Sequence, residues 1–186
     1  MNAFAKVDKV TFLRFAAEHT EQRYEYVRGR IVQQMTGGTR DHGQVARRIT
    51  RMIEDQVDSA RHTVIPERGV ETSETIRYPD VVVEPADEPG KSLSTMRPAL
   101  IVEVLSPSTA ATDLDVKPAE YLSLDTLDAY VIASQVEAAM LVYERGADGR
   151  LATEPREISG SNAELKISGR SFTLTLRFAD IYKGIA

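Results

Sequence analysis

The segment that most restricts how this chain can fold is an apolar run at residues 99–105, Ala-Leu-Ile-Val-Glu-Val-Leu. Its length and its β-branched residues predict a strand, and because both alternating positions are apolar, both faces of that strand must be covered. Such a strand requires further layers of structure above and below its sheet. Glu103 lies in the middle of the run. Since a carboxylate is costly to bury unless it is paired, protonated or bound to a cation, Glu103 marks a candidate functional position.

The composition is that of an ordinary globular protein: 186 residues, of which 42% are hydrophobic and 27% charged. This length suffices for one sizeable core, so we expect a single domain over residues 1–186. No apolar stretch is long enough to span a membrane, and the first residues lack the apolar core of a signal peptide, which predicts a cytoplasmic protein with no membrane partner. The chain has no cysteine, so oxygen or imidazole groups must hold any metal.

The formal net charge of −5 argues against a protein that coats nucleic acid through bulk charge. It does not exclude a nuclease, whose contacts with phosphate can be local. The densest group of basic residues consists of Arg40, Arg47, Arg48 and Arg51. Acidic residues are interleaved with this group, namely Asp41, Glu54, Asp55 and Asp58. We interpret the stretch as the solvated face of a helix rather than as a DNA-binding groove.

Hydrophobic periodicity predicts helices and strands in mixed order. Apolar residues at helical spacing predict a short helix within residues 10–21 and a long amphipathic helix over residues 39–60. The turn at Arg28-Gly29 predicts a hairpin over residues 24–35. Further strands are expected at residues 62–67, 74–85, 99–105, 128–135, 138–146 and 151–159, with a helix over residues 114–124 and a strand and short helix in the tail at 166–186. This order predicts a mixed α/β sheet with flanking helices.

Two of the expected strands carry acids in apolar surroundings. Asp80 follows Pro79 and opens a run of three valines, and Glu103 lies within the next apolar strand. If these strands are neighbours, the two carboxylates can converge on one divalent cation, which removes their mutual repulsion. Each acid also has a structural interpretation: Glu103 could be a buried ion-pair partner, and Asp80 could cap a turn.

The segment after Glu103 adds a candidate cationic group. Asp113, Lys117 and Tyr121 are four residues apart, so on an unbroken helix they would share one face. A helix packed over the sheet could bring the Lys117 ammonium near the carboxylates, where it could bind a phosphate oxygen or orient and help deprotonate an attacking water. Pro118 opposes an unbroken helix. If the helix instead starts near Lys117 with Pro118 at its first position, Asp113 leaves the shared face.

In their order and spacing, these residues resemble the Uma2 family, also called DUF820, of the PD-(D/E)XK restriction-endonuclease-like superfamily. The resemblance covers most of residues 10–183 and rests on several short motifs taken together. They are Tyr-Glu-Tyr-Val-Arg-Gly at residues 24–29, His42, Tyr-Pro-Asp at 78–80, Val-Glu-Val-Leu-Ser-Pro-Ser-Thr at 102–109, Asp113, Lys117, Tyr121, and Leu-Asp-Ala-Tyr-Val-Ile at 127–132.

The resemblance implies a restriction-endonuclease-like fold, with a mixed β-sheet core flanked by helices, and Mg²⁺- or Mn²⁺-dependent hydrolysis of DNA phosphodiesters. It implies that Asp80 and Glu103 bind the metal, with the backbone carbonyl of Val104 as a further ligand. The superfamily lysine lies two residues after the second acid, where this chain has Leu105. The chain resembles the branch in which the lysine has moved to the following helix, which implies that Lys117 is the catalytic lysine. Because nucleases of this fold often act as dimers, a homodimer is also expected.

Four further residues are candidate accessory members of this site: Glu25, His42, Ser106 and Asp113. His42 could contact metal or phosphate from the long helix, or could be a solvent-exposed residue of its first turn. Glu25 could lie near the metal, or could pair with Arg28 or Arg30. Ser106 could contact phosphate, although a turn that leads into a helix favours a hydroxyl in any case.

A function of a different class stays open beside the nuclease. In it, the chain is a catalytically inactive restriction-endonuclease-like fold that serves as a nucleic-acid-binding or protein-interaction module. Asp80, Glu103 and Lys117 would then form only a structural salt-bridged cluster. The negative net charge and Pro118 favour this interpretation, whereas the order of the motifs favours the nuclease.

Overall fold

The structure is a computed structural model that describes residues 6–34, 38–106 and 112–185. The helical elements of these residues are α1 (Lys9–Glu18), α2 (Arg40–Glu54), the π-helical turn η1 (Thr112–Val116), α3 (Lys117–Tyr121) and α4 (Phe178–Ile181). The strands are β1 (Tyr24–Val27), β2 (Arg30–Gln33), β3 (His62–Pro66), β4 (Gly69–Glu71), β5 (Thr75–Arg77), β6 (Val81–Pro85), β7 (Ser94–Thr95), β8 (Leu100–Val104), β9 (Ala129–Ala133), β10 (Ala139–Glu144), β11 (Arg156–Ser159), β12 (Glu164–Ser168) and β13 (Thr173–Arg177). None of the described helices is long and apolar enough to cross a membrane.

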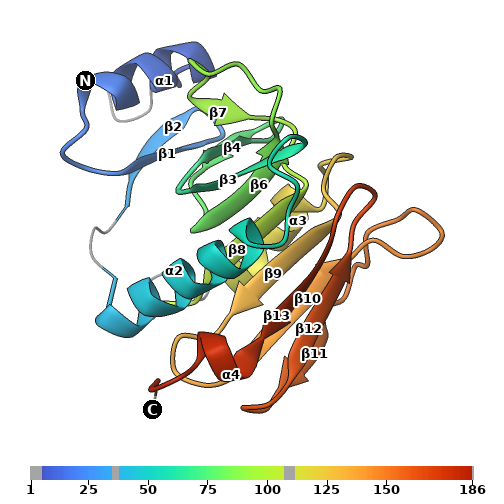
Figure 1. Ribbon diagram of the computed structural model, residues 1–186. Coiled ribbons are helices and arrows are strands. Elements are labelled where there is room, and N and C mark those ends of the chain that lie inside the picture. Colours follow the sequence, from blue (N-terminus) through green and yellow to red (C-terminus); the bar gives the residue numbers. More distant parts are fainter. Residues whose placement is uncertain (1–5, 35–37, 107–111, 186) are drawn as a thin grey trace.

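A six-stranded sheet in the order β11-β10-β9-β8-β6-β3 forms the centre of the molecule (Figure 1). Strand β8 pairs parallel with β9 and antiparallel with β6, so the sheet is mixed. All five residues of β8 are buried. The predicted central strand and the predicted mixed α/β sheet are therefore confirmed. A second sheet has the order β2-β1-β5-β4-β7, and β12 and β13 form a separate hairpin.

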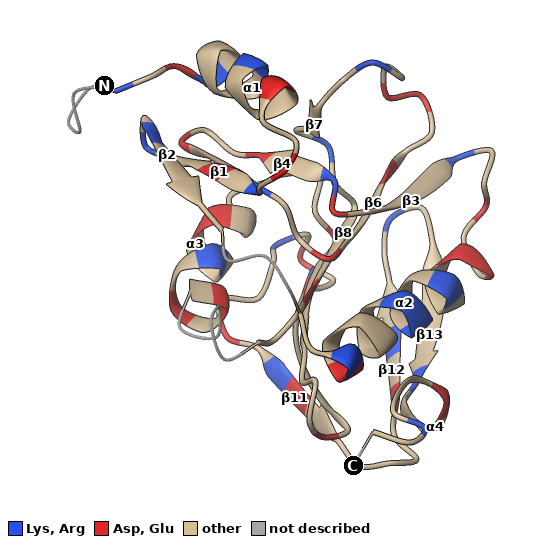
Figure 2. Ribbon diagram, turned by 90° about the vertical axis from the view of Figure 1, so that its left-hand side faces the viewer, with Lys and Arg blue, Asp and Glu red and all other residues tan. Residues whose placement is uncertain are grey.

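The six-stranded sheet is covered on both faces, as the continuous apolar pattern of β8 requires. Figure 2 shows α2 and α3 on opposite sides of β6 and β8. Val45, Ile49 and Ile53 of α2 are fully buried in one cluster, to which the β12–β13 hairpin and α4 also contribute. On the other face, Tyr121 of α3 packs in a cluster with Ile101 of β8. Because neighbouring residues of a strand point to opposite faces, Glu103 points with Ile101 toward α3.

The long helix is shorter than its sequence pattern predicts. Thr39 caps the N-terminus of α2, since its side-chain oxygen accepts the backbone N–H of His42. The helix ends at Glu54 instead of continuing to residue 60. The carbonyl of Asp58 accepts the backbone N–H groups of Arg61 and His62, and this turn leads directly into β3.

Residues 74–85 form two strands in different sheets, rather than the one strand that the sequence predicts. Strand β5 pairs with β1 and β4, whereas β6 pairs with β3 and β8. The break falls at residues 78–80, where Pro79 lacks the N–H group that a central strand needs. As a result, Asp80 lies where the chain passes from one sheet to the other. The sequence also does not predict the short strands β4 and β7 or the pairing of β12 with β13.

The predicted hairpin is confirmed, with β1 and β2 joined at Arg28 and Gly29. Both turn residues have positive φ, 51° and 88°. This conformation fits the tight turns that match the twist of paired strands, and it explains the glycine.

The packing of α2 against the central sheet yields a stability prediction. Because Ile49 is fully buried in that cluster, Ile49→Ala should lower the free energy of unfolding by about 2–5 kcal/mol. Val10→Ala is the control, since Val10 is 67% exposed on α1, and it should change that free energy by less than about 0.5 kcal/mol. Urea denaturation measures both, and equal stabilities of the two variants would contradict the described packing.

Candidate active site

The two acids singled out in the sequence lie on neighbouring strands. In the antiparallel pair of β6 and β8, Val81 lies opposite Val102. The adjacent positions, Asp80 and Glu103, therefore lie across from each other at the point where β6 begins. Oδ2 of Asp80 accepts the backbone N–H of Val104 at 2.7 Å, which fixes the carboxylate beside the end of β8.

Glu103 is buried, and two groups of α3 contact one of its oxygens. Lys117 Nζ lies 2.7 Å from Oε1 of Glu103, and the hydroxyl of Tyr121 donates to the same oxygen at 3.0 Å. The side chains of Glu103 and Lys117 are each only 6% exposed. The expectation that a helix brings the Lys117 ammonium near the sheet acids therefore agrees with the structure.

Asp113 stays beside Lys117 even though α3 begins at Lys117. The π-helical turn η1 runs directly into α3, and Pro118 lies in the first turn of α3. Proline is tolerated there because its missing N–H group would have no helical partner. The expectation that Asp113 would leave the face under this arrangement is wrong, since its Oδ1 lies 2.8 Å from Lys117 Nζ.

Acidic side chains outnumber basic ones around Glu103, and their negative charges affect its pKa. Burial raises the pKa of Glu103 to about 7, and the negative charges of Asp113 and Asp80 add to the shift, while Lys117 opposes it. Burial lowers the pKa of Lys117, but its attraction to Glu103 and Asp113 outweighs that effect, so the pKa is raised. Lys117 therefore remains a cation. A further positive charge at the site would reduce the repulsion among its carboxylates.

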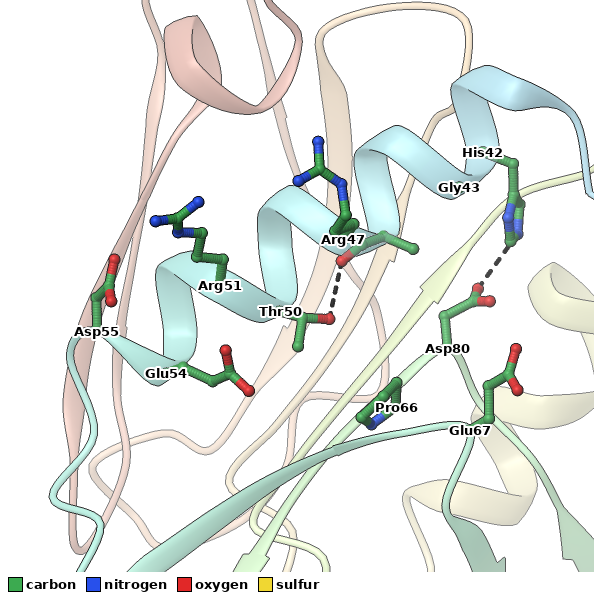
Figure 3. Close-up of a pocket in the computed structure, with 11 residues that line it drawn as sticks. His42, Gly43, Arg47, Thr50, Arg51, Glu54, Asp55, Pro66, Glu67 and Asp80 are labelled. Carbon is green, nitrogen blue, oxygen red and sulfur yellow. Dashed lines mark hydrogen bonds and ion pairs between the residues drawn. The ribbon is translucent and has the colours of Figure 1, made fainter.

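His42 approaches the site from the opposite face of the sheet. Its Nε2 lies 3.4 Å from Oδ2 of Asp80, as the dashed line in Figure 3 shows. The hydrogen bond with Asp80 raises the pKa of His42 above its usual value, burial opposes the shift, and the Val104 backbone contributes to raising it. His42 is thus partly buried beside Asp80 rather than a fully exposed first-turn residue.

Glu25 pairs with neither Arg28 nor Arg30, and both expected partners are wrong. It faces inward from β1, is buried, and accepts a hydrogen bond from Arg77 of β5 at 2.6 Å. Arg28 lies at the hairpin turn and pairs with Glu74 instead. The negative charge of Glu25 also contributes to the raised pKa of Lys117, so Glu25 lies within electrostatic range of the site.

Arg77 is the residue that sequence reasoning missed. It is buried and forms two further hydrogen bonds with Glu120 of α3, both of 2.8 Å. Arg77 therefore connects Glu25 of the second sheet to the helix that carries Lys117. The available signal was a charged residue within the short apolar strand around residue 76, similar to the signal that identified Glu103.

Ser106 lies two residues after the end of β8 and is partly buried. Leu105, at the position of the usual superfamily lysine, is also partly buried and packs on the α3 side of the sheet. Residues 107–111, which complete the predicted polar turn and the motif at 102–109, lie outside the described residues.

The oxygen groups present fit a hard divalent cation. Contacts among the described residues use Oδ2 of Asp80 and Oε1 of Glu103, one oxygen of each carboxylate. Mg²⁺ typically takes one or two carboxylates and keeps several waters. Within the described ranges, no group of three or more His, Asp or Glu side chains is arranged to hold a metal, so any such ion would depend on the Asp80–Glu103 pair, on backbone carbonyls and on water.

The fold and the paired acids define the class: the chain has a restriction-endonuclease-like α/β fold. Its structure matches the crystal structure of "a putative nuclease belonging to DUF820" from Anabaena variabilis ATCC 29413, with a TM-score of 0.72 and 17% identity over 89% of this chain and 93% of that one. Residues 10–177 match the family described as "Uma2: Putative restriction endonuclease", and the chain belongs to this family. Restriction-endonuclease-like enzymes generally use divalent metals.

Two relatives come from Synechocystis sp. (strain ATCC 27184 / PCC 6803 / Kazusa). The protein named "Uncharacterized protein slr1290" is 29% identical over 98% of this chain and 95% of its own length. The protein named "Uncharacterized protein sll1609" is 26% identical over 81% of this chain and 87% of its own length. The similarity to the first of these relatives therefore extends over nearly the whole chain.

The raised pKa of Glu103 predicts a specific pH dependence of stability. Because the folded state holds a proton on Glu103 up to about pH 7, whereas an ordinary glutamate loses it near pH 4.5, the folded state binds more protons in this window. The stability that Glu103 contributes therefore falls as the pH rises from about 4.5 to 7. Glutamine does not titrate, so Glu103→Gln lacks this contribution. The free energy of unfolding of the variant minus that of the wild type should therefore rise by on the order of 2 kcal/mol from pH 5 to pH 8.

Urea denaturation at these two pH values, in the presence of EDTA, measures the difference. The comparison of the two proteins at each pH cancels the titration of all other groups to first order. If the wild type and Glu103→Gln showed the same change in stability between pH 5 and pH 8, the raised pKa would be wrong.

Proposed function

We propose that this protein is an endonuclease that hydrolyses DNA phosphodiester bonds with Mg²⁺ or Mn²⁺. The observation that carries the proposal is the position of Glu103, which lies opposite Asp80 on the adjacent strand and 2.7 Å from the ammonium of Lys117. Two carboxylates at the ends of neighbouring strands, with a lysine from α3 beside them, could hold a metal ion that assists phosphodiester hydrolysis. Membership of the Uma2 family and the likeness to the DUF820 structure support the same reaction class.

In this proposal Asp80, Glu103 and the backbone carbonyl of Val104 hold the metal ion. When bound, the ion supplies Lewis-acid stabilisation of the phosphate and a lower pKa for the attacking water. The Val104 N–H orients Asp80, since it donates to Oδ2 at 2.7 Å. The Tyr121 hydroxyl orients Glu103 in the same way, since it donates to Oε1.

Lys117 acts as a cation in this proposal. Its raised pKa keeps the ammonium protonated near neutral pH, so it is poorly suited to remove a proton from water. It is well suited to donate a hydrogen bond to a phosphate oxygen on which negative charge develops. Asp113 then serves to hold the ammonium in place, at 2.8 Å.

One observation favours the second function, an inactive binding or interaction module. Lys117 already contacts two carboxylates, those of Glu103 and Asp113, so the cluster can persist as a purely structural ion-pair network. The two functions differ in what they require of the carboxylates of Asp80 and Glu103. A nuclease requires them for activity, whereas a module requires them only for stability. A homodimer, which would present two sites to the two strands of a duplex, remains part of the nuclease proposal.

The proposal predicts the behaviour of three variants in plasmid cleavage. With Mg²⁺ or Mn²⁺, the wild type should nick supercoiled plasmid, and Asp80→Asn, Glu103→Gln and Lys117→Met should each lose at least about 100-fold in rate. Gel electrophoresis of the plasmid at several times measures the rates. A thermal melt of each variant checks that it is folded.

The matched controls are Lys166→Met and Glu157→Gln. Both residues are exposed, on β12 and β11, so the same chemical changes are made away from the site and should leave the rate unchanged. Nicking that persists at the wild-type rate in folded Glu103→Gln would refute the proposed site. A wild type without activity on any DNA would favour the inactive module.

A further inference from the structure

A groove of about 550 Å³ lies along α2 and has the candidate active site at one end. Figure 3 shows the His42–Asp80 contact near the start of the helix, with the groove continuing along α2 toward Asp55. The lining residues from α2 and the residue after it are His42, Gly43, Ala46, Arg47, Thr50, Arg51, Glu54 and Asp55. Pro66, Glu67 and Asp80 line it from the sheet.

One stripe of α2 along this groove is basic. Gly43, Arg47 and Arg51 are spaced four residues apart, so they share one face of the helix, and all three are exposed. Figure 3 shows the two arginine side chains extending to the same side of α2. Neither arginine has an ion pair with any residue that the structure describes. Arg48 differs, because its guanidinium donates to the backbone carbonyls of Ile181 and Lys183.

Gly43 is unusual in the interior of an exposed helix. Glycine in such a position costs roughly 0.5–1 kcal/mol relative to alanine. A Cβ atom at Gly43 would meet no heavy atom within 4 Å, so packing within the protein does not require a glycine there. The residue leaves the helix surface bare next to His42, where an approaching chain could pass close to the backbone.

Among the described residues, the acids that line the groove form no ion pair with the two arginines of this stripe. Glu67 pairs with Arg23, and Asp80 lies beside His42 at the active-site end. Glu54 and Asp55 follow Arg51 by three and four residues at the other end of the groove. The two arginines therefore lie between acids at the two ends of the groove.

We infer that Gly43, Arg47 and Arg51 form a track that binds the sugar–phosphate backbone of the DNA strand next to the bond that is cut. The inference rests on the proposed function. Unpaired arginines supply the charge-assisted hydrogen bonds that phosphates accept, and the bare glycine admits the strand beside His42. The interpretation of Arg47 and Arg51 as part of a solvated helix face is the alternative to this track.

Binding of fluorescently labelled DNA to the full chain tests the track. Fluorescence anisotropy is recorded in Ca²⁺, which accepts the same oxygen ligands as Mg²⁺, with one single-stranded and one duplex oligonucleotide over a range of salt concentrations. Arg47→Gln/Arg51→Gln should bind about tenfold more weakly at low salt. The slope of log affinity against log salt should become shallower by about 1.4 for the single strand or about 1.8 for the duplex.

The charge-matched control is Arg14→Gln/Arg150→Gln. Both of these arginines are exposed outside the groove and have no ion pair among the described residues, so the double variant should bind with the affinity and the salt slope of the wild type. If this control weakened binding as much as Arg47→Gln/Arg51→Gln does, the track would be overturned, because the loss of two positive charges anywhere on the protein would then explain the effect.

A second variant blocks the groove without changing its charge. Gly43→Trp should weaken binding at least tenfold. The matched control is Gly90→Trp, which should bind as the wild type does, because Gly90 is exposed outside the groove and a Cβ atom there would also meet no heavy atom within 4 Å. Wild-type affinity in either Gly43→Trp or Arg47→Gln/Arg51→Gln overturns the track. If plasmid nicking persists at the same time, the nuclease proposal stands without it; a wild type that neither binds nor cuts DNA overturns both.

Discussion

The burial of Glu103 in the central sheet, with its charge offset by Lys117, is the interaction on which the candidate site depends. Removing Lys117 would leave Glu103 and Asp113 buried without their shared cation, and breaking a buried ion pair in this way typically costs about 3–5 kcal/mol. The pair therefore fixes the position of α3 over β8. It also leaves the site incompletely neutralised, since Asp113 shares the same lysine and the negative charge of Asp80 also acts on Glu103. In the proposed function, a divalent cation offsets this excess of negative charge.

A second buried arrangement holds the helix from the other side. Arg77 connects Glu25 in the second sheet to Glu120 on α3 through hydrogen bonds of 2.6–2.8 Å. Lys117 and Glu120 belong to the same short helix, so the two networks together determine its position between the sheets. The five-stranded sheet thus contributes to the site although none of its strands carries a proposed metal ligand. The opposite face is joined to the site by His42 of α2, which lies next to Gly43 at the start of the basic stripe.

Much of this arrangement follows from local sequence patterns. The apolar run around Glu103 predicts a strand covered on both faces, and this strand, the hairpin and the proximity of Lys117 agree with the structure, whereas the long helix ends earlier than predicted. Partner choice does not follow from such patterns, because it is decided between segments far apart in the chain. The sequence predicts that Glu25 pairs with the nearby Arg28 or Arg30, yet its partner is 52 residues away. For the same reason, local patterns predict neither the break at Pro79 between two sheets nor the π-helical turn that keeps Asp113 beside Lys117.

The central claim is that Asp80 and Glu103 share one metal ion. A crystal soaked with Mn²⁺ and measured at a wavelength where manganese scatters anomalously tests it most directly. We predict one strong anomalous peak at about 2.0–2.4 Å from a carboxylate oxygen of each acid and from the Val104 carbonyl. A crystal without a peak at this position, in which Lys117 still bridges Glu103 and Asp113, would contradict the claim.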